Sequence, residues 1–445
     1  MATRLFGTDG VRGVAGVWPL DPPTVARLGA ALVRERRKRR PLRLIVGRDT
    51  RESGEWIERE IGRGAAAEGA TLTSAGIIPT PAVAYLAKVD GFDLGIVLSA
   101  SHNPFGDNGI KVFSGTGEKF NEADERAVEA IMADTGWSVA STTDAHVESR
   151  DLSAGYLAHL RRLLPDPRGL RGARIAVDMA NGATTSTAVT LLESLGFSVV
   201  PLGHAPDGRN INLACGSTHP AGLSAAVVQH HCRLGVAFDG DGDRAIFVDA
   251  RGRVVDGDAV LLMLGRDFQT RGGLPGSAVV ATVMSNIGLE IALGKAGIKL
   301  IRTPVGDKYV MEEMLARGYV LGGEQSGHVI LAEHLPTGDG QATLLAVLRV
   351  MASTGKELDE LVADFVTYPQ TLVNVRVREK KAVADVPEIQ AAVARVEAAL
   401  SGRGRVLVRY SGTEPLLRIM IEGPDQASVQ AWAEEIAEAV RATLT

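Results

Sequence analysis

Three aspartates alternate with glycine in the segment FDGDGDRA, and this spacing constrains the fold more than any other feature of the sequence. Asp239, Asp241 and Asp243 bring three carboxylates so close together that they repel one another unless their charge is compensated. A hard divalent cation with oxygen ligands removes that cost, and the glycines let the backbone fold tightly around it. The segment therefore predicts a metal-binding loop.

An EF-hand calcium loop begins with the same spacing and is the first alternative. That loop needs Gly at its sixth position and Glu at its twelfth. Here Arg244 and Ala250 stand at those positions, and strand-like segments rather than helices flank the loop. These differences exclude an EF-hand and favour Mg²⁺, with a solvated acidic turn as the remaining alternative.

A second motif, LSASHNPFGDNGIKVF at residues 98–113, ends an apolar strand in small polar residues and a proline. Open α/β sheets bind ligands at the carboxyl ends of their strands. No G-x-S-x-G elbow surrounds Ser101, which disfavours a hydrolase triad. Beside a metal loop, Ser101 suits a phosphate carrier because the cation would neutralise the phosphoryl oxygens. An ordinary turn is the alternative.

Such a carrier requires nearby cations. Three aspartates, one Mg²⁺ and a phosphoserine sum to a charge of about -3. Lys111, in NGIKVF, and Arg244 are the candidates to balance it.

Two further loops carry polar groups that suit a phosphorylated sugar. In GGEQSGH, Glu324, Ser326 and His328 alternate, so an extended segment would present all three on one side to sugar hydroxyls. In VRYSGTEPLLR, the donors suit a phosphate dianion. Those donors are Arg409, Ser411, Gly412, Thr413 and Arg418. A glycine-rich connection and a hairpin turn are the respective alternatives.

Weaker polar signals lie elsewhere, and each taken alone is expected to be structural or solvated. They are Arg12 in GTDGVRG, Arg48 and Arg51 in VGRDTRESG, His219 in CGSTHP, and Asp307 and Lys308 in TPVGDKYV. Cys215 and Cys232 are expected to pack as free thiols.

The length of 445 residues indicates about three domains, at about 150 residues per domain, and is compatible with two to four. Short apolar strands alternate with amphipathic helices, which favours parallel βαβ units. The pattern restarts at 172–200 and again at 276–304, residues 138–151 are interpreted as a boundary, and VDARGRVV predicts a tight hairpin. After about residue 368, alternating strands and a closing helix predict a smaller domain with an antiparallel sheet.

Composition excludes several classes of partner. A formal net charge of -5 argues against a nucleic acid or an anionic membrane surface. Two cysteines do not make a disulfide framework, which favours a reducing compartment. The opening MATRLFGTDGVRG has no apolar signal-peptide core, and no apolar run approaches the ~18 residues of a membrane span. We therefore expect a cytoplasmic protein.

Taken together, the motifs resemble the α-D-phosphohexomutase superfamily over essentially the whole chain. The segments that carry the resemblance are FGTDGVRG, SASHNPFGDNGIK, CGSTHP, DGDGDR, GEQSGH and RYSGTEP. The resemblance implies an α/β fold of four domains around a central cleft, three similar α/β units with mixed sheets and a smaller C-terminal α+β domain. The expected segments are 1–152 with the phosphoserine loop, 153–256 with the metal loop, 257–368 with the sugar loop and 369–445 with the phosphate loop.

The resemblance also implies roles for single residues. Ser101 would be a phosphoserine in the active enzyme and would complete a site for one Mg²⁺ per chain with Asp239, Asp241 and Asp243. The expected catalytic set is Ser101, Lys111, Arg244, His328 and Arg12, with Lys111 a candidate general base and His328 a candidate proton-transfer partner. The expected substrate-binding set is Glu324, Ser326, His102, Arg409, Ser411, Gly412, Thr413 and Arg418.

The implied reaction interconverts glucosamine 6-phosphate and glucosamine 1-phosphate through a 1,6-bisphosphate, on the route to UDP-N-acetylglucosamine and cell-wall precursors. Glucosamine or glucose 1,6-bisphosphate would serve as activator. A phosphomannomutase or phosphoglucomutase is the nearest rival, and there we would expect Met in place of Gln325. A sugar-phosphate sensor and a metal-dependent phosphatase are the alternatives from other classes. The expected partner is a small sugar phosphate, and a homodimer is left open.

Overall fold

The structure, a computed structural model, describes residues 4–7, 9–36, 40–167, 169–411 and 415–445. Its described part divides into two compact units. Unit 1 comprises Met1–Met284 and Ile298–Ala363, and unit 2 comprises Ser285–Gly297 and Asp364–Thr445. The boundaries expected near residues 152, 256 and 368, and the central cleft, stay predictions.

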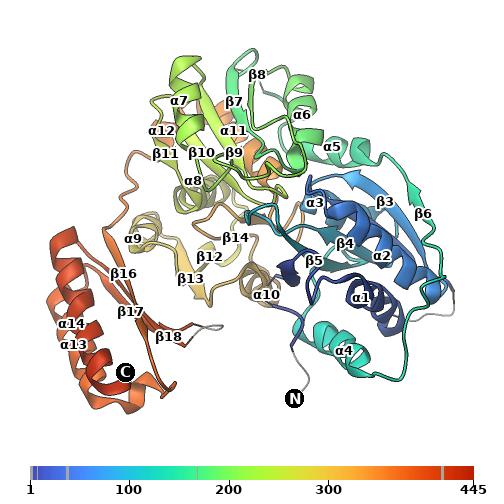
Figure 1. Cartoon of the computed structure of the whole chain (residues 1–445). Coiled ribbons are helices and arrows are strands. Elements are labelled where there is room, and N and C mark those ends of the chain that lie inside the picture. The colour runs from blue at the N-terminus through green and yellow to red at the C-terminus, as the bar shows by residue number, and fades with distance from the viewer. Residues whose placement is uncertain (1–3, 8, 37–39, 168, 412–414) are drawn as a thin grey trace. The chain divides into compact units, whose positions relative to one another are not determined.

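Unit 1 contains three mixed sheets (Figure 1). The first is built around β4, and every residue of that strand is buried. The strand order is β1-β5-β4-β2-β3-β6. The strands are β1 (Val11–Val14), β2 (Arg43–Arg48), β3 (Thr71–Ile77), β4 (Leu94–Leu98), β5 (Asp107–Ser114) and β6 (Val147–Ser149). The helices are α1 (Pro22–Glu35), α2 (Gly54–Ala67), α3 (Thr80–Val89) and α4 (Glu122–Ala133).

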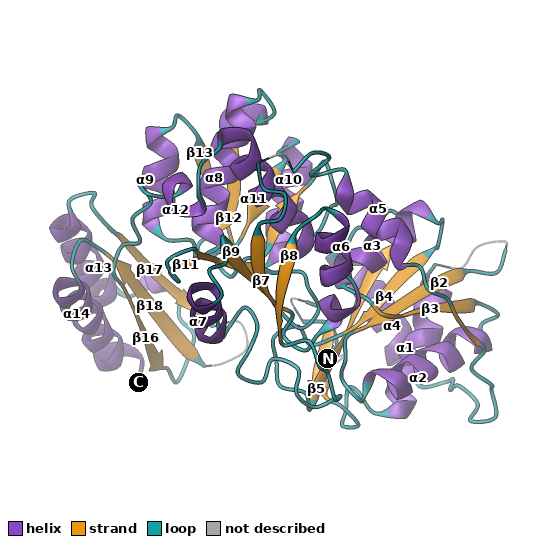
Figure 2. Cartoon of the chain, turned by 90° about the horizontal axis from the view of Figure 1, so that it is seen from above, coloured by secondary structure: helices purple, strands orange, loops and turns teal. Residues whose placement is uncertain are grey.

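Figure 2 shows helices on both faces of this sheet, with α1 and α2 on one face and α3 on the other. Helix α1 begins where the side chain of Asp21 accepts a hydrogen bond from the amide of Thr24 and Pro22 opens the first turn. Residues 138–151 are not only a boundary, because β6 lies within them and pairs in parallel with β3. Its three residues are too few and too polar to show a strand pattern in the sequence.

The second sheet has the order β11-β10-β9-β7-β8. Its elements are β7 (Arg174–Asp178), β8 (Ser198–Leu202), β9 (Leu234–Phe238), β10 (Ala245–Asp249), β11 (Val254–Val255), the short helix Ala183–Ser186, α6 (Ala188–Ser194) and α7 (Ala221–Gln229). Helix α5 (Ser153–Arg161) precedes them. The hairpin predicted from VDARGRVV is confirmed, with Val248 opposite Val254.

The third sheet has the order β13-β12-β14-β15. Its elements are α8 (Gly257–Thr270), the short helix Pro275–Ser277, β12 (Ala278–Thr282), β13 (Lys299–Thr303), α10 (Asp307–Arg317), β14 (Leu321–Gly323), β15 (Val329–Leu331), α11 (Gly340–Thr354) and α12 (Leu358–Leu361). Asp256 and Asp339 cap α8 and α11 at their N-termini.

One topological device recurs in the three sheets of unit 1. A buried strand runs parallel to one neighbour and then turns into an antiparallel partner, in the pairs β4–β5, β9–β10 and β14–β15. The connections of these pairs are the loops that carry Ser101, the three aspartates and Glu324. Three sequence-distant loops thus occupy equivalent places in similar units, as the repeating pattern predicted.

Unit 2 contains the predicted antiparallel sheet, in the order β16-β18-β17, with α13 and α14 covering one face (Figure 1). The elements are α9 (Ile287–Lys295), β16 (Gln370–Arg376), the short helix Val383–Asp385, α13 (Pro387–Leu400), β17 (Arg405–Tyr410), β18 (Leu416–Glu422) and α14 (Gln426–Leu444). Helix α9 joins this unit because the buried Glu422 accepts a hydrogen bond from the amide of Ile287. Within the described residues, no helix is both long and apolar enough to cross a membrane.

Candidate active site

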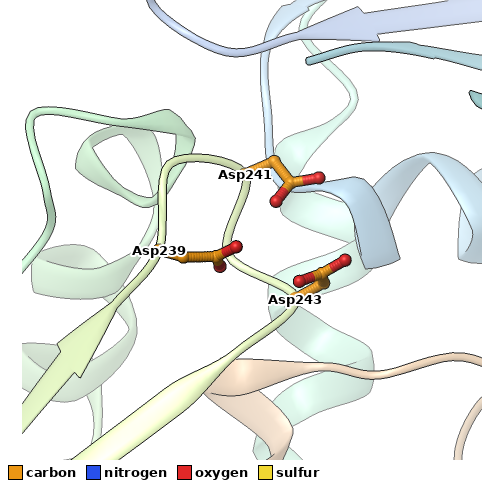
Figure 3. Close-up of side chains that lie close together, drawn as sticks. All are labelled: Asp239, Asp241 and Asp243. Atoms are coloured by element: carbon orange, nitrogen blue, oxygen red, sulfur yellow. The ribbon is translucent and has the colours of Figure 1, made fainter. Parts of the chain in front are cut away.

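The aspartate loop joins β9 to β10 and is folded so tightly that one oxygen from each carboxylate lies within 4.8 Å of the others (Figure 3). All three side chains are buried. The loop also approaches the Ser101 loop closely, since a Cβ at Gly240 would lie 2.5 Å from the carbonyl oxygen of Ser101. Glycine at position 240 is therefore a requirement of the contact between the two loops.

The donor set of this loop fits a hard divalent cation. Oδ1 of Asp241 and Oδ1 of Asp243 are buried and accept no hydrogen bond from the described residues. Burial, together with the charges of Asp243 and Asp241, holds the pKa of Asp239 well above its usual range. Buried carboxylate oxygens with unused lone pairs are the ligands that Mg²⁺ prefers. The three aspartates form a possible metal site, as the sequence predicted.

Ser101 lies against this site, and its hydroxyl donates a hydrogen bond to Oδ2 of Asp239. Its backbone φ of 52° is in the left-handed region, which is uncommon for a residue other than glycine. Side chains from three segments hold it there. Ser99 Oγ accepts from the Ser101 amide at 2.9 Å, and the Asn212 amide group donates to the Ser101 carbonyl at 2.9 Å. Such over-determined backbone is typical of active sites.

Arg51 holds the Ser101 loop through hydrogen bonds to its backbone. Its side chain is fully buried and donates to four backbone carbonyls of the loop, those of Ser101, Asn103, Pro104 and Asp107. Asp49 balances its charge at 2.9 Å. The expectation of a structural role for Arg51 is therefore correct.

Lys111 reaches the metal loop from β5. Its Nζ lies 2.8 Å from Oδ2 of Asp241, 3.2 Å from Oδ2 of Asp243 and 3.0 Å from Oδ2 of Asp9. Burial alone would lower the pKa of this amine, but the three carboxylates raise it well above its usual value. In this arrangement Lys111 is an ammonium group. Its charge matches the predicted balancing role, and the role of Lys111 as a general base stays a prediction.

His102 lies beside the serine hydroxyl, and Arg244 contacts His102. Arg244 Nη1 lies 3.2 Å from Nδ1 of His102, which in turn lies 3.4 Å from Ser101 Oγ. Burial and the charges of Arg244 and Arg12 lower the pKa of His102 to about 4. The imidazole is therefore neutral near pH 7 and accepts the hydrogen bond from Arg244. Arg12 pairs with Asp9 and points toward the carbonyl oxygen of Ala100.

The GGEQSGH segment does not extend as the alternation required. Residues 324–328 form a tight turn between β14 and β15, in which the Gly327 amide donates to the Glu324 carbonyl. Ser326 Oγ lies 3.4 Å from Glu324 Oε2, and both residues are half-buried. The shared orientation expected for all three side chains is therefore wrong for His328, because a turn breaks the alternation of a strand.

His328 lies deeper, against the charged groups of the site. Its Nδ1 is 3.6 Å from Asp243 Oδ1, and its Nε2 is 3.5 Å from Asp307 Oδ2. Burial alone would lower the pKa of this imidazole, but the carboxylates of Asp243 and Asp307 raise it above its usual value. His328 therefore contacts Asp243 and Asp307 rather than lying beside Glu324.

Two charged residues of this site, Asp9 and Lys119, were not predicted from the sequence. A third, Asp307, was among the weak signals. Lys119, in the turn after β5, bonds both Asp9 and Asp307. Neither Asp9 nor Lys119 stands in a pattern of its own, and their partners are distant in sequence. Only the position of Asp9 in GTDGVRG, beside Arg12, offered a signal.

In unit 2, the predicted phosphate loop follows β17. Arg409 and Arg418 face each other across the β17–β18 pair, and the Ser411 amide donates to the Leu416 carbonyl at 2.8 Å. Burial and the neighbouring charge of Arg418 lower the pKa of Arg409. Gly412 and Thr413 lie outside the described residues. Two opposed guanidinium groups favour an anionic ligand over a plain hairpin.

Comparison with protein families matches the chain in four consecutive segments. They are phosphoglucomutase/phosphomannomutase α/β/α domain I at residues 3–138, domain II at 154–252, domain III at 256–368 and the C-terminal domain at 372–439. The expected class, three α/β/α units with mixed sheets and a C-terminal domain with an antiparallel sheet, is confirmed.

Curated relatives match over the full length. A phosphoglucosamine mutase of Solibacter usitatus is 49% identical, with 99% of each chain covered. A phosphoglucosamine mutase of Moorella thermoacetica is 48% identical, with 96% of this chain and 97% of the relative covered.

Solved structures share the fold. A phosphoglucomutase/phosphomannomutase family protein from Burkholderia thailandensis superimposes with a TM-score of 0.80 at 23% identity, with 99% of this chain and 98% of that chain covered. The N-acetylphosphoglucosamine mutase of Aspergillus fumigatus, solved in complex with GlcNAc-6P and magnesium, gives 0.68 at 18% identity, with 99% and 96% covered.

Proposed function

The chain belongs to the phosphoglucomutase/phosphomannomutase family, and we propose that within it the chain is a phosphoglucosamine mutase. It would interconvert glucosamine 6-phosphate and glucosamine 1-phosphate, with Ser101 carrying the phosphoryl group. The observation that supports the carrier is the contact of the Ser101 hydroxyl with Asp239 inside a buried triple-carboxylate loop. The choice of an amino sugar rests on the full-length relatives.

Asp239, Asp241 and Asp243 would hold one Mg²⁺ per chain, and an oxygen of phosphorylated Ser101 would complete the site. The unused carboxylate oxygens described above support this assignment. When bound, such a cation neutralises charge on the phosphoryl oxygens.

The chain's own residues provide the remaining charge. Buried Lys111 and half-buried Arg244 supply two cations next to the carboxylates, and Arg12 adds a third, paired with Asp9. His102, whose Nδ1 accepts from Arg244, lies with that atom 3.4 Å from Ser101 Oγ. His328 is proposed to move a proton at the sugar hydroxyl, and Lys111 to act as a charge partner.

Two phosphate-binding places follow from the chemistry. Within one sugar, O1 and O6 cannot line up as attacking and leaving oxygens for a direct transfer. The enzyme must therefore give its own phosphoryl group to the sugar and take the other phosphoryl group back. Phosphoserine donates its phosphoryl group to the free O1, and the O1 proton leaves to a base, which gives a 1,6-bisphosphate and the Ser101 hydroxyl. After the sugar turns over, Ser101 attacks the 6-phosphate, which restores phosphoserine and releases glucosamine 1-phosphate.

Binding groups for the rest of the substrate lie on two other loops. Glu324 and Ser326 would accept and donate hydrogen bonds to sugar hydroxyls. The phosphate that is not reacting would bind the unit 2 loop, through Arg409, Ser411, Gly412, Thr413 and Arg418. Glucosamine or glucose 1,6-bisphosphate would act as activator by phosphorylating Ser101. A cytoplasmic location stays a prediction.

Intact-mass measurement coupled to turnover tests the proposal. Incubation with glucose 1,6-bisphosphate should add one phosphoryl group to the wild-type chain and to Ser114→Ala, but none to Ser101→Ala. Ser101→Ala should also lose isomerisation, by at least about 1,000-fold, since the group carrier is gone. Full isomerisation by Ser101→Ala would contradict the carrier role, and a higher kcat/KM on glucose 6-phosphate than on glucosamine 6-phosphate would contradict the substrate.

A further inference from the structure

Charged side chains of unit 1 form a closed ring in which acids and bases alternate. In order around the ring they are Asp243, Lys111, Asp9, Lys119, Asp307 and His328, which returns to Asp243. The members come from the segment before β1, β5, the turn after β5, the aspartate loop, α10 and the turn before β15. A single ring therefore ties three parts of the chain that are far apart in sequence.

The ring has two sides that differ in chemistry. On one side, Lys111 and His328 contact Asp243 of the metal loop, and all three residues belong to the proposed active site. Lys119 closes the opposite side, with Nζ 2.7 Å from Asp9 Oδ1 and also bonded to Asp307 Oδ2. Lys119 itself has no hydrogen bond or ion pair to Ser101 or the three aspartates among the contacts of the described residues.

Each of the two acids that Lys119 binds also contacts a residue of the proposed catalytic set. Asp9 holds Lys111 at 3.0 Å, and Asp307 lies 3.5 Å from Nε2 of His328. Without the ammonium of Lys119, the half-buried carboxylates of Asp9 and Asp307 would each lose a cation, and their contacts with Lys111 and His328 would rearrange. Burial alone would lower the pKa of Lys119, but Asp307 and Asp9 raise it above its usual value, so its charge is permanent near pH 7.

We propose that Lys119 is a positioning residue for phosphoryl transfer, which orients Lys111 through Asp9 and His328 through Asp307. The inference rests on the proposed function, because it assigns a role in that reaction. Since Lys119 acts through other residues, its loss should lower kcat and leave substrate binding by Glu324 and Ser326 nearly unchanged.

The alternative explanation is that Lys119 only anchors α10, through Asp307, to the first sheet. The chain offers a matched control for this alternative. Lys308, the next residue to Asp307, bonds Glu125 of α4 at 3.0 Å. That pair also joins α10 to the N-terminal part of unit 1, and Lys308 and Glu125 are as buried as Lys119 and Asp307. It has no contact with a member of the ring's catalytic side in the described residues.

Steady-state kinetics of four variants test the inference with saturating Mg²⁺ and bisphosphate activator. Lys119→Met should lower kcat by about 10- to 100-fold, as expected for groups that orient reacting residues, with KM changed less than about threefold. Lys308→Met should keep kcat within about twofold of wild type. Asp307→Asn should resemble Lys119→Met, and the double variant Lys119→Met/Asp307→Asn should be less impaired than the product of the single effects.

Thermal unfolding accompanies each variant, so that a folding defect is seen directly. If Lys119→Met does not fold, Asp307→Asn carries the test by itself. Equal kcat for Lys119→Met and Lys308→Met, or a kcat for folded Asp307→Asn near that of wild type, would contradict the inference while wild-type turnover leaves the proposed function intact. Absence of isomerisation by the wild-type chain would contradict the proposed function instead.

Discussion

Asp239 lies in an electrostatically unfavourable position, because burial and the charges of Asp243 and Asp241 hold its pKa well above its usual range. It is fully buried between two further carboxylates, and its hydrogen bonds come from the Ser101 hydroxyl and the Arg244 amide. A residue kept in so unfavourable a position serves binding rather than folding. We therefore expect the carboxylate cluster to lower the free energy of unfolding of the metal-free chain and to raise the affinity of the folded chain for a cation.

Replacing Asp239 with Asn tests this expectation. In EDTA, Asp239→Asn should raise the free energy of unfolding by about 1 kcal/mol, because one like charge leaves the buried cluster. Mg²⁺ at about 100 times its Kd should stabilise the wild-type chain by about 2.7 kcal/mol and the variant far less. Urea unfolding with and without Mg²⁺ measures both effects.

Asp144→Asn, at an exposed acid, is the control and should change neither value. An Asp239→Asn chain that is less stable in EDTA, yet gains as much from Mg²⁺ as the wild type, would contradict the electrostatic account of the loop.

At the scale of the element, the GGEQSGH turn is fixed by its neighbours rather than by its own residues. The Gln325 side chain donates to Asp256 Oδ2 at 3.1 Å, and its carbonyl accepts from the Gly257 amide at 3.0 Å. On its other side, the Gly327 carbonyl accepts from the Ala245 amide. The turn is therefore attached both to the start of α8 and to the strand that leaves the metal loop.

Gln325→Met should loosen this attachment, because methionine cannot donate to Asp256. Loss of one hydrogen bond to a carboxylate costs about 1.5–3 kcal/mol. Part of that loss should appear as a KM for glucosamine 6-phosphate raised by about 2- to 10-fold, with a smaller change in kcat. Initial-rate kinetics measure the two constants.

Gln269→Met, near the other end of α8, provides the comparison and should behave as wild type. If Gln325→Met altered kcat alone, the turn would not be held by Gln325 for substrate binding.

At the scale of the whole molecule, a stack of three rings joins three parts of unit 1. Tyr85 of α3, His159 of α5 and His334, in the segment after β15, stack with centroids 4.3 Å and 4.0 Å apart. Burial, together with the charges of His334 and Arg162, lowers the pKa of His159 to about 4, whereas Asp339 acts in the opposite direction. The junction is therefore built for a neutral imidazole.

This junction makes folding stability depend on pH. Because the folded pKa of about 4 is below the ordinary value of 6.5, the unfolded chain binds more protons between them, and stability falls as pH falls from 6.5 to 4. His159 is partly solvated, so the expected loss is about 1–2 kcal/mol after screening. Urea unfolding at pH 7 and pH 4.5 should show a smaller loss for His159→Phe, which keeps the stacked ring. An equal loss for both proteins would exclude His159 as the cause.

The sequence by itself determined which local segments carry chemistry. The Asp-Gly alternation indicated a cation loop, and the strand-to-serine junction indicated a carrier, because ligand spacing and strand termination are properties of adjacent residues. The recurring strand and helix pattern likewise gave the three similar units and the final antiparallel sheet. The pairing of Lys111 with Asp241, residues far apart in sequence, had no such local pattern.

Only the tertiary structure decided how these segments meet. It placed His328 against Asp243 and Asp307 instead of beside Glu324, assigned Arg51 to the serine loop, and brought Asp9 and Lys119 into the ring. The physical reason is the same in each case. A single buried charge leaves no periodic signal in the sequence, and its partner is fixed only when distant strands bring their ends to one place.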